Sequence, residues 1–328
     1  SQPTTHTNTG NSDLQPDLIW FKDRGAAYSH YLVDSSRGRA KGLKSDTTAA
    51  ETTSGQAGWD LVSFDSDGFK VGAPSEGNST NAGTSSKVAW QWKANGGTTA
   101  SNSDGSITST VQANQDAGFS IVTYTGTGNT ATVGHGLGVA PKIIIGKRRS
   151  QTANWWVGGS ILTSAQTLYL NLTNAIDTVG EAAVFNVTTS TTFKLGTDTN
   201  RNAFNATNVA YCFAEKQGYS KFGKYVGNGT SGTDGTFIYT GFKPAWVMTK
   251  RASSADAWVI YDNKRDTFNP ENNYLLANSS AAETTTANWD FVSNGFKSRT
   301  GNSQGASGVT FIYMAFAENP FVTSTGIP

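Results

Sequence analysis

The residues best suited to chemistry in this sequence are three lysines that follow three apolar runs. Lys22, Lys147 and Lys250 each stand six positions after a proline, and each has an arginine within the next two positions. In a repeated structure such cations would form a basic binding face, because every copy adds a positive charge. Cations at a strand edge also guard a sheet against edge-to-edge pairing. Both interpretations stay open, and we favour the second.

Two neighbouring tryptophans, Trp155 and Trp156, follow Lys147 and Arg149 and suggest a sugar-binding platform. Successive residues of a strand point to opposite faces, so the two indoles are expected on different sides. Packing between sheets is the other interpretation, and we favour it for Trp258, which recurs at the position of Trp155. The candidate glycan-binding residues are Trp155, Trp156, Lys147 and Arg149.

The histidines give little support for catalysis. His6, His30 and His135 form no serine–histidine–acid pattern with their neighbours. His30 occupies the position of Trp155 and Trp258 in the other copies, which favours packing at a half-exposed position. We therefore predict that the protein is not an enzyme.

Two glycine-containing stretches resemble ligand loops, but we predict that both are turns. Residues 126–149, GTGNTATVGHGLGVAPKIIIGKRR, lead into a strand-like run after Pro141, whereas a phosphate-binding loop needs a helix there. Residues 65–76 resemble a calcium loop with Glu76 at its twelfth position, but the glycine stands fourth instead of sixth. The first stretch is predicted to be a hairpin, and no metal site or cofactor is expected.

The composition argues against several classes of function. With 25 cations against 24 anions among 328 residues, the net charge of +1 gives no footprint for nucleic acid. The single cysteine, Cys212, excludes an intrachain disulfide and a cysteine-based zinc site. No run of about 18 apolar residues occurs, so membrane insertion is not expected. No signal peptide is expected either.

Internal repetition is the strongest signal in the sequence. PKIIIGK at Pro141 aligns with PAWVMTK at Pro244 and with PDLIWFK at the start of the chain, and VAYCFAE ending at Glu215 aligns with IYMAFAE ending at Glu318. The spacing between the two prolines equals the spacing between the two glutamates, so no gap separates these landmarks. The sequence therefore contains three copies of one unit.

The copies are predicted to consist of antiparallel strands. Apolar runs of strand length occur in each copy, alternating runs surround them, and glycine turns separate them. We predict an all-β fold of three tandem antiparallel β-sandwich repeats of jelly-roll or lectin-like type. The predicted parts are residues 1–94 (first repeat), 95–117 (polar linker), 118–217 (second repeat) and 218–328 (third repeat with a short C-terminal tail).

One aromatic position recurs in the closing strand of each copy. Trp92, Phe213 and Phe316 occupy this position. We expect each ring to point into a core.

Several phrases together resemble a known family. PDLIWFKDRG, VAWQWKANG, VAYCFAEKQGYSKFG and FIYTGFKPAWVMTKR are similar to the repeat-containing virion proteins of tailed bacteriophages, especially marine ones. The resemblance extends from about Gln15 to Phe321. It implies a tail-fibre-like or other structural component of the particle without catalysis, and it assigns no active residues. A typical fibre has a particle-binding domain before its repeats, whereas Ser1–Leu14 alone precede them here, so a capsid-surface role stays open.

The expected function is a non-enzymatic surface protein of a bacteriophage virion, assembled in the bacterial host cytoplasm, with adhesion to host-surface glycans. The alternatives are capsid (head) decoration and a glycan depolymerase, which would need two carboxylates about 5–10 Å apart. The resemblance also implies other virion proteins as partners and a homo-oligomer, most simply a trimer.

Overall fold

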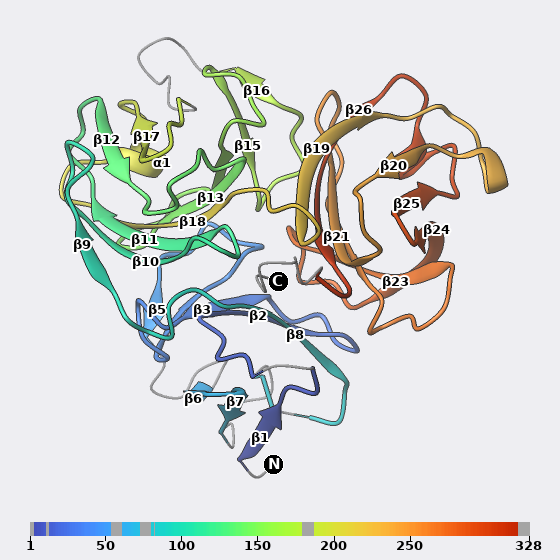
Figure 1. Cartoon of the computed structure of the whole chain (residues 1–328), viewed down its shortest axis with the longest axis horizontal. Coiled ribbons are helices and arrows are strands. Elements are labelled where there is room, and N and C mark those ends of the chain that lie inside the picture. Colours follow the sequence, from blue (N-terminus) through green and yellow to red (C-terminus); the bar gives the residue numbers. More distant parts are fainter. Residues whose placement is uncertain are drawn as a thin grey trace.

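The computed structural model describes residues 3–10, 13–53, 61–72, 80–81, 83–178 and 187–320. The protein is all-β, with 46% of its residues in strands and 3% in helices, as predicted. Figure 1 shows three groups of strands around a common centre, with blue strands at the bottom, green at the upper left and orange at the right. We call them unit 1 (residues 3–94), unit 2 (95–214) and unit 3 (215–320). Among the described residues no helix has the length and apolar character needed to cross a membrane.

Unit 1 has a large sheet and a small one. Its strands are β1 (Thr4–Thr7), β2 (Leu18–Asp23), β3 (Tyr31–Asp34), β4 (Lys41–Leu43), β5 (Thr52–Thr53), β6 (Leu61–Asp65), β7 (Gly68–Val71) and β8 (Lys87–Trp92). The large sheet has the order β5-β4-β3-β2-β8, and the small sheet has the order β1-β7-β6. All six residues of β2 are buried.

Unit 2 contains the second large sheet. Its elements are β9 (Ala100–Asn102), β10 (Ser109–Asn114), β11 (Phe119–Thr125), β12 (Ala131–Gly134), β13 (Ile143–Arg148), β14 (Trp156–Gly158), β15 (Gln166–Tyr169), β16 (Asp177–Thr178), β17 (Thr192–Leu195), α1 (Thr199–Asn202) and β18 (Thr207–Phe213). The large sheet has the order β16-β15-β14-β13-β18-β11-β10-β9, and β12 pairs with β17 separately.

The segment predicted as a polar linker, residues 95–117, is part of unit 2. It contains β9 and β10, which pair with each other, and β10 also pairs with β11. Two apolar side chains in this polar segment, Ile107 and Val111, are buried and attach it to the unit. The linker prediction is therefore corrected, because backbone pairing with β11 and two buried side chains hold this polar segment on the sheet.

Unit 3 contains the third large sheet. Its elements are β19 (Ser220–Val226), η2 (Gly232–Asp234), β20 (Phe237–Tyr239), β21 (Pro244–Arg251), β22 (Trp258–Asp262), β23 (Glu271–Leu276), β24 (Thr284–Val292), β25 (Gly295–Ser298), η3 (Ser303–Gly305) and β26 (Thr310–Ala317). The order is β19-β26-β21-β22-β23-β24-β25-β20. Residues at the start of β19 and at the end of β20 line one groove.

The same strand pairing recurs in the three units. β2, β13 and β21 pair on one side with β3, β14 and β22, and on the other side with β8, β18 and β26. The register also matches, because Trp92, Phe213 and Phe316 of the last three strands lie opposite Leu18, Ile143 and Trp246 of the first three. This register defines the matching positions of the units.

The three matching aromatic rings meet at the centre of the protein. The centroid distances are 6.2 Å from Trp92 to Phe213, 5.8 Å from Trp92 to Phe316 and 6.1 Å from Phe213 to Phe316. One cluster of buried apolar residues, drawn from all three units, surrounds them. We call it the central cluster. The predicted burial is confirmed, and the core that these three rings enter is shared by all three units.

Each large sheet is also covered on its outer face. Separate apolar clusters lie there in unit 1, unit 2 and unit 3. In β2, for example, Leu18 and Trp20 face the central cluster, whereas Ile19 and Phe21 face the outer one. A sheet buried on both faces needs a continuous apolar run, which explains the runs seen in the sequence.

The glycine-rich residues 126–149 form turns before a strand. Gly128, Gly136 and Gly138 have φ angles of +75°, +72° and +71°, a region that favours glycine. A strand, β13, follows Pro141 as predicted. The hairpin prediction is wrong, because β12 pairs with β17 and not with its neighbour β11. The polar turn before β12 leads the chain to the outer layer instead of back along the sheet.

The second glycine-containing stretch turns where predicted. Gly68 follows Asp67 and is the first residue of β7, which pairs with β6, and its φ is +121°. Glu76, the twelfth position of the calcium-loop pattern, lies outside the described residues.

Candidate functional site

Three buried lysines join the units to one another. Lys22, Lys147 and Lys250 have exposed fractions of 2%, 0% and 1%. Each ammonium donates a hydrogen bond to a backbone carbonyl of another unit, at Ser280 (3.1 Å), Thr48 (3.0 Å) and Thr173 (3.0 Å) respectively. We call each contact between two units a seam. Lys147 of unit 2 reaches unit 1 at the first seam, Lys22 of unit 1 reaches unit 3 at the second, and Lys250 of unit 3 reaches unit 2 at the third.

Both sequence-based interpretations of the lysines are therefore corrected. Neither a basic surface nor a guarded strand edge exists at these positions, because the side chains are covered and their charges face carbonyl oxygens. Further carbonyls of the lysine's own unit complete each set, at Asp23 and Ala26 for Lys22, at Ala153 for Lys147 and at Arg251 for Lys250. Burial lowers the pKa of each lysine to about 8.

A second set of matching residues crosses the same seams. His30, Trp155 and Trp258 are each at most 1% exposed, so the predicted packing is confirmed but the predicted half-exposure of His30 is wrong. Their ring nitrogens bond carbonyls of the adjoining unit, at Leu276 (3.0 Å), Lys44 (2.7 Å) and Tyr169 (2.9 Å). Each unit thus contributes one ammonium and one ring N–H to its neighbour.

The environment of His30 keeps its ring neutral. Trp20 donates its indole N–H to Nδ1 of His30 at 2.8 Å, which places the imidazole proton on Nε2 toward Leu276. Burial, with the nearby Lys22 charge, lowers the pKa of His30 to about 3. A neutral imidazole with both nitrogens bonded acts here as a structural donor in place of the tryptophan indole.

Buried ion clusters reinforce the first two seams. At the first seam Arg37 bonds Asp34, Glu51 (2.8 Å) and the hydroxyl of Tyr211 (3.0 Å), and Arg149 also pairs with Glu51 at 2.8 Å. At the second seam the matching residues Arg265, Asp262, Glu283 and Arg24 repeat this arrangement, and Trp90 donates to Asp262 at 2.9 Å.

The candidate glycan residues lie at the first seam and behind it. Trp155 belongs to the central cluster and Trp156 to the outer cluster of unit 2, so the predicted opposite orientation is confirmed. Both faces of the sheet are covered, however, and neither indole is more than 1% exposed. Arg149 alone keeps part of its side chain, 20%, at the surface. Lys147, Trp155 and Arg149 come together as packing and bonding groups, and Trp156 packs beside Phe193 on the other face.

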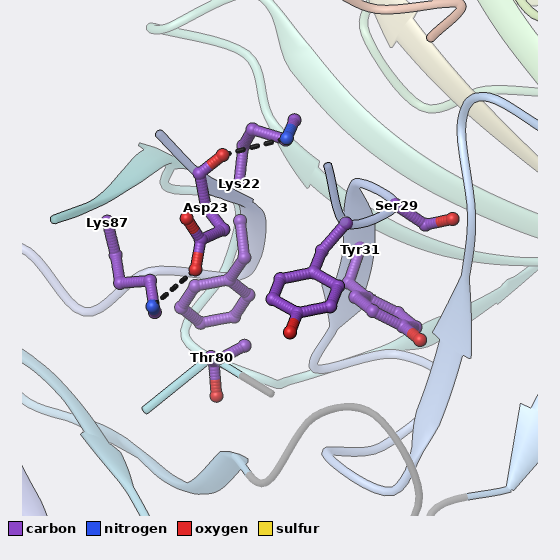
Figure 2. Close-up of a pocket in the computed structure, with 8 residues that line it drawn as sticks. Lys22, Asp23, Ser29, Tyr31, Thr80 and Lys87 are labelled. Carbon is purple, nitrogen blue, oxygen red and sulfur yellow. Dashed lines mark hydrogen bonds and ion pairs between the residues drawn. The ribbon is translucent and has the colours of Figure 1, made fainter. Parts of the chain in front are cut away.

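A small cavity opens beside Lys22 and is drawn in Figure 2. Its empty volume is about 250 Å³, including space open to solvent. Asp23 forms an ion pair with Lys87 and accepts hydrogen bonds from the backbone N–H groups of Gly25 and Ala26. The charged groups along this wall thus bond one another and the main chain, and their role is to fix the turn after β2.

No group of three or more His, Cys, Asp or Glu side chains in the described parts of the chain is arranged to hold a metal ion. His135 is buried, accepts from the backbone N–H of Leu137 at 3.2 Å and contacts the carbonyl of Thr189 at 3.2 Å. Its ring therefore fixes the turn after β12.

A polar groove lies on unit 3 between two segments distant in sequence. It has an empty volume of about 810 Å³ with its open mouth included, and residues from the β18–β19 turn, β19 and the end of β20 line it. The lining residues are Glu215, Gln217, Gly218, Ser220, Lys221, Tyr239, Thr240 and Gly241. Sequence reasoning missed this groove, since its one signal is a short strand, Phe237–Tyr239, whose aromatic residues alternate outward.

The comparison with family models matches one family over almost the whole chain. A domain of unknown function, DUF7483, matches residues 2–320. The chain belongs to the DUF7483 family. The match runs through all three units, in agreement with the central cluster that the three units share. No curated protein and no solved structure matches this chain.

Proposed function

We propose that this DUF7483 protein is a non-enzymatic structural protein of a bacteriophage virion surface, a tail-fibre-like component that adheres to host-surface glycans. The proposed finer fold is three tandem antiparallel β-sandwich repeats of jelly-roll or lectin-like type. Its support is the recurring strand pairing, together with the second apolar layer outside each large sheet.

The observation that carries the structural role is the closed ring of seams. Unit 1 donates to unit 3, unit 3 to unit 2, and unit 2 to unit 1, each through a buried lysine and a ring N–H. Stacked repeats need capping units at both ends, whereas a ring has no unpaired end. Three units are held together in this way without disulfides, which suits a component exposed outside a cell.

The phage assignment rests on the sequence resemblance, and the proposed homotrimer rests on the same ground. The inward faces of the three large sheets already cover one another within a single chain. A trimer would therefore use outer surfaces or sheet edges. Light scattering on the purified protein at micromolar concentration tests the trimer. We expect a mass of three chains, and the mass of a single chain would contradict the proposed trimer.

The experiment for the main proposal is to locate the protein on intact particles of the virus that encodes it. We expect purified particles to contain the chain, and immunogold electron microscopy with a specific antibody to label their outer surface. Label at the tail supports the appendage role, and label over the head supports the decoration alternative. Purified particles that lack the chain would contradict the proposal.

A further inference from the structure

We propose that the groove between β19 and β20 binds a short neutral oligosaccharide. This inference rests on the adhesive part of the proposed function and gives it a site. The groove forms where the two end strands of the third sheet come near each other, since β19 pairs only with β26 and β20 only with β25 among the described strands. Side chains from residues 215–221 and 239–241 are thereby brought together.

An exposed aromatic ring forms one wall of the groove. Tyr239 has 65% of its surface exposed, and its hydroxyl bonds no other described residue. Gly241 has a φ of +85°, and a side-chain carbon placed there would lie 3.5 Å from the Tyr239 hydroxyl. The glycine therefore keeps the space beside the hydroxyl open. A tyrosine has an apolar face and a polar tip, which matches the C–H face and the hydroxyl rim of a pyranose.

Polar groups with spare bonding capacity lie along the rest of the groove. Glu215 accepts from the backbone N–H of Phe222 through Oε1 (2.8 Å), which fixes the carboxylate, and no described residue bonds its Oε2. The exposed amide of Gln217 adds both donors and an acceptor. Lys221 and Tyr239 add donors. Such a mixture of donors and acceptors suits vicinal hydroxyl groups, each of which can donate and accept.

The charge of the groove favours an uncharged ligand. Its one carboxylate, Glu215, and its one ammonium, Lys221, lie 3.6 Å apart, with side chains 29% and 44% exposed. The two charges offset each other, so an acidic sugar would meet the carboxylate and a cationic ligand would meet the lysine. The space that water-sized molecules can occupy in the groove is about 370 Å³, which is within the range of small-ligand sites.

The test uses the purified full chain and saturation-transfer NMR with defined probes. The neutral probes are mannotetraose, maltotetraose, cellotetraose and chitotetraose, and tetragalacturonate is the acidic probe. We expect saturation transfer to at least one neutral tetraose and a dissociation constant in the millimolar to micromolar range, as for a single weak site. Saturation of no neutral probe, or of the uronate alone, would overturn the proposal.

Matched variants place the site. Tyr239→Ala should weaken binding at least tenfold and Gln217→Ala severalfold, because each removes a groove contact while changing an exposed side chain. Phe268→Ala is the control, since this aromatic residue is 85% exposed in the same unit but does not line the groove. Unchanged binding in Tyr239→Ala, or equal loss in Phe268→Ala, would reject the groove. Sugar binding by the purified chain does not depend on where the chain lies on a particle. The groove proposal can therefore fail while the proposed structural role holds.

Discussion

The first and third seams make the same backbone contacts with opposite side-chain chemistry. At both seams a lysine ammonium donates a hydrogen bond to a backbone carbonyl of the other unit. Both also have a backbone N–H···O bond of 2.8 Å at the matching position, from Glu51 to Arg149 at the first seam and from Ile176 to Ala252 at the third. At the first seam, however, Arg37 and Asp34 are fully buried as an ion pair. Among the residues that the structure describes, the third seam has no counterpart to this pair.

Every polar member of the first seam's cluster is replaced at the third seam. The positions that match Arg37, Asp34, Glu51, Tyr211 and Arg149 hold Leu162, Gly159, Ile176, Met314 and Ala252. Leu162, Met314 and Ala252 belong to the central cluster, and Ile176 packs against it. The difference teaches that the lysines and ring N–H groups are common to all seams, whereas a complete apolar set stands at the third seam in place of the ion cluster. Because a single buried charge without its partner is costly, we expect the two sets to be exchangeable only as wholes.

The largest expected effect is the removal of one charge from the first seam. Arg37→Leu leaves Asp34 buried without its cationic partner and leaves Glu51 paired with Arg149 alone, and this should lower the free energy of unfolding by about 3–5 kcal/mol. Urea denaturation measures the change. The conservative Arg37→Lys should also destabilise, because an ammonium cannot reproduce the guanidinium's bonds to Asp34, Glu51 and Tyr211. A loss below 1 kcal/mol for Arg37→Leu would show that the cluster is not part of the seam's stability.

Transplanting the whole apolar set should reverse most of that loss. A variant with Arg37→Leu, Asp34→Gly, Glu51→Ile, Tyr211→Met and Arg149→Ala gives the first seam the chemistry of the third. We expect it to recover about 3 kcal/mol or more relative to Arg37→Leu alone, because no buried charge is left without a partner. If the transplant is less stable than the single variant, the two seams are not interchangeable solutions.

The lysines should behave alike at both seams when pH is varied. The pKa of Lys147 and of Lys250 is lowered by burial from 10.5 to about 8 in the folded protein. Between these values the unfolded chain holds a proton that the folded protein lacks, so stability rises with pH in this window. Lys147→Met and Lys250→Met should each flatten the slope between pH 8 and 9.5 by up to about 1.4 kcal/mol per pH unit. Lys264→Met, at an exposed lysine, is the control. An equal flattening of the slope in this variant would show that the pH dependence does not come from the seam lysines.

The smallest effect is expected at the surface of the third seam. Arg251 pairs with Asp256 of its own unit at 2.8 Å, with side chains 22% and 30% exposed. Asp256→Asn should cost only about 0.2–1 kcal/mol, because both side chains are partly in contact with water, which screens the pair. A cost as large as that of Arg37→Leu, measured by the same urea titration, would erase the contrast between the two seams.

Strands were the part of this fold that the sequence could reveal. The apolar runs at Leu18–Phe21, Ile143–Ile145 and Trp246–Met248 became β2, β13 and β21, because their burial on both faces leaves a direct trace in hydropathy. The position of the lysines could not be predicted. Their acceptors are backbone carbonyls of another unit, and carbonyls have no residue-type signal.

The candidate site was missed for a related reason. Trp155 and Trp156 point to opposite faces of their sheet, and in a strand with one exposed face one of them would reach the surface. Here a second layer covers the outer face, so the alternation of directions did not show which side chain is exposed. Tyr239 lies in a strand of three residues, too short for a pattern. The groove exists because β19 and β20, the two end strands of the third sheet, lie near each other in the folded protein. The sequence of neither strand indicates this proximity.

The most direct test of the shared core is a double-mutant cycle between Phe213 of unit 2 and Phe316 of unit 3. Their ring centroids are 6.1 Å apart in the central cluster. With the mild variants Phe213→Leu and Phe316→Leu and the double variant, urea denaturation should give one unfolding transition and a coupling energy of about 0.5–3 kcal/mol. Effects that add within about 0.5 kcal/mol, in separate transitions, would contradict one core and show three independently folded units.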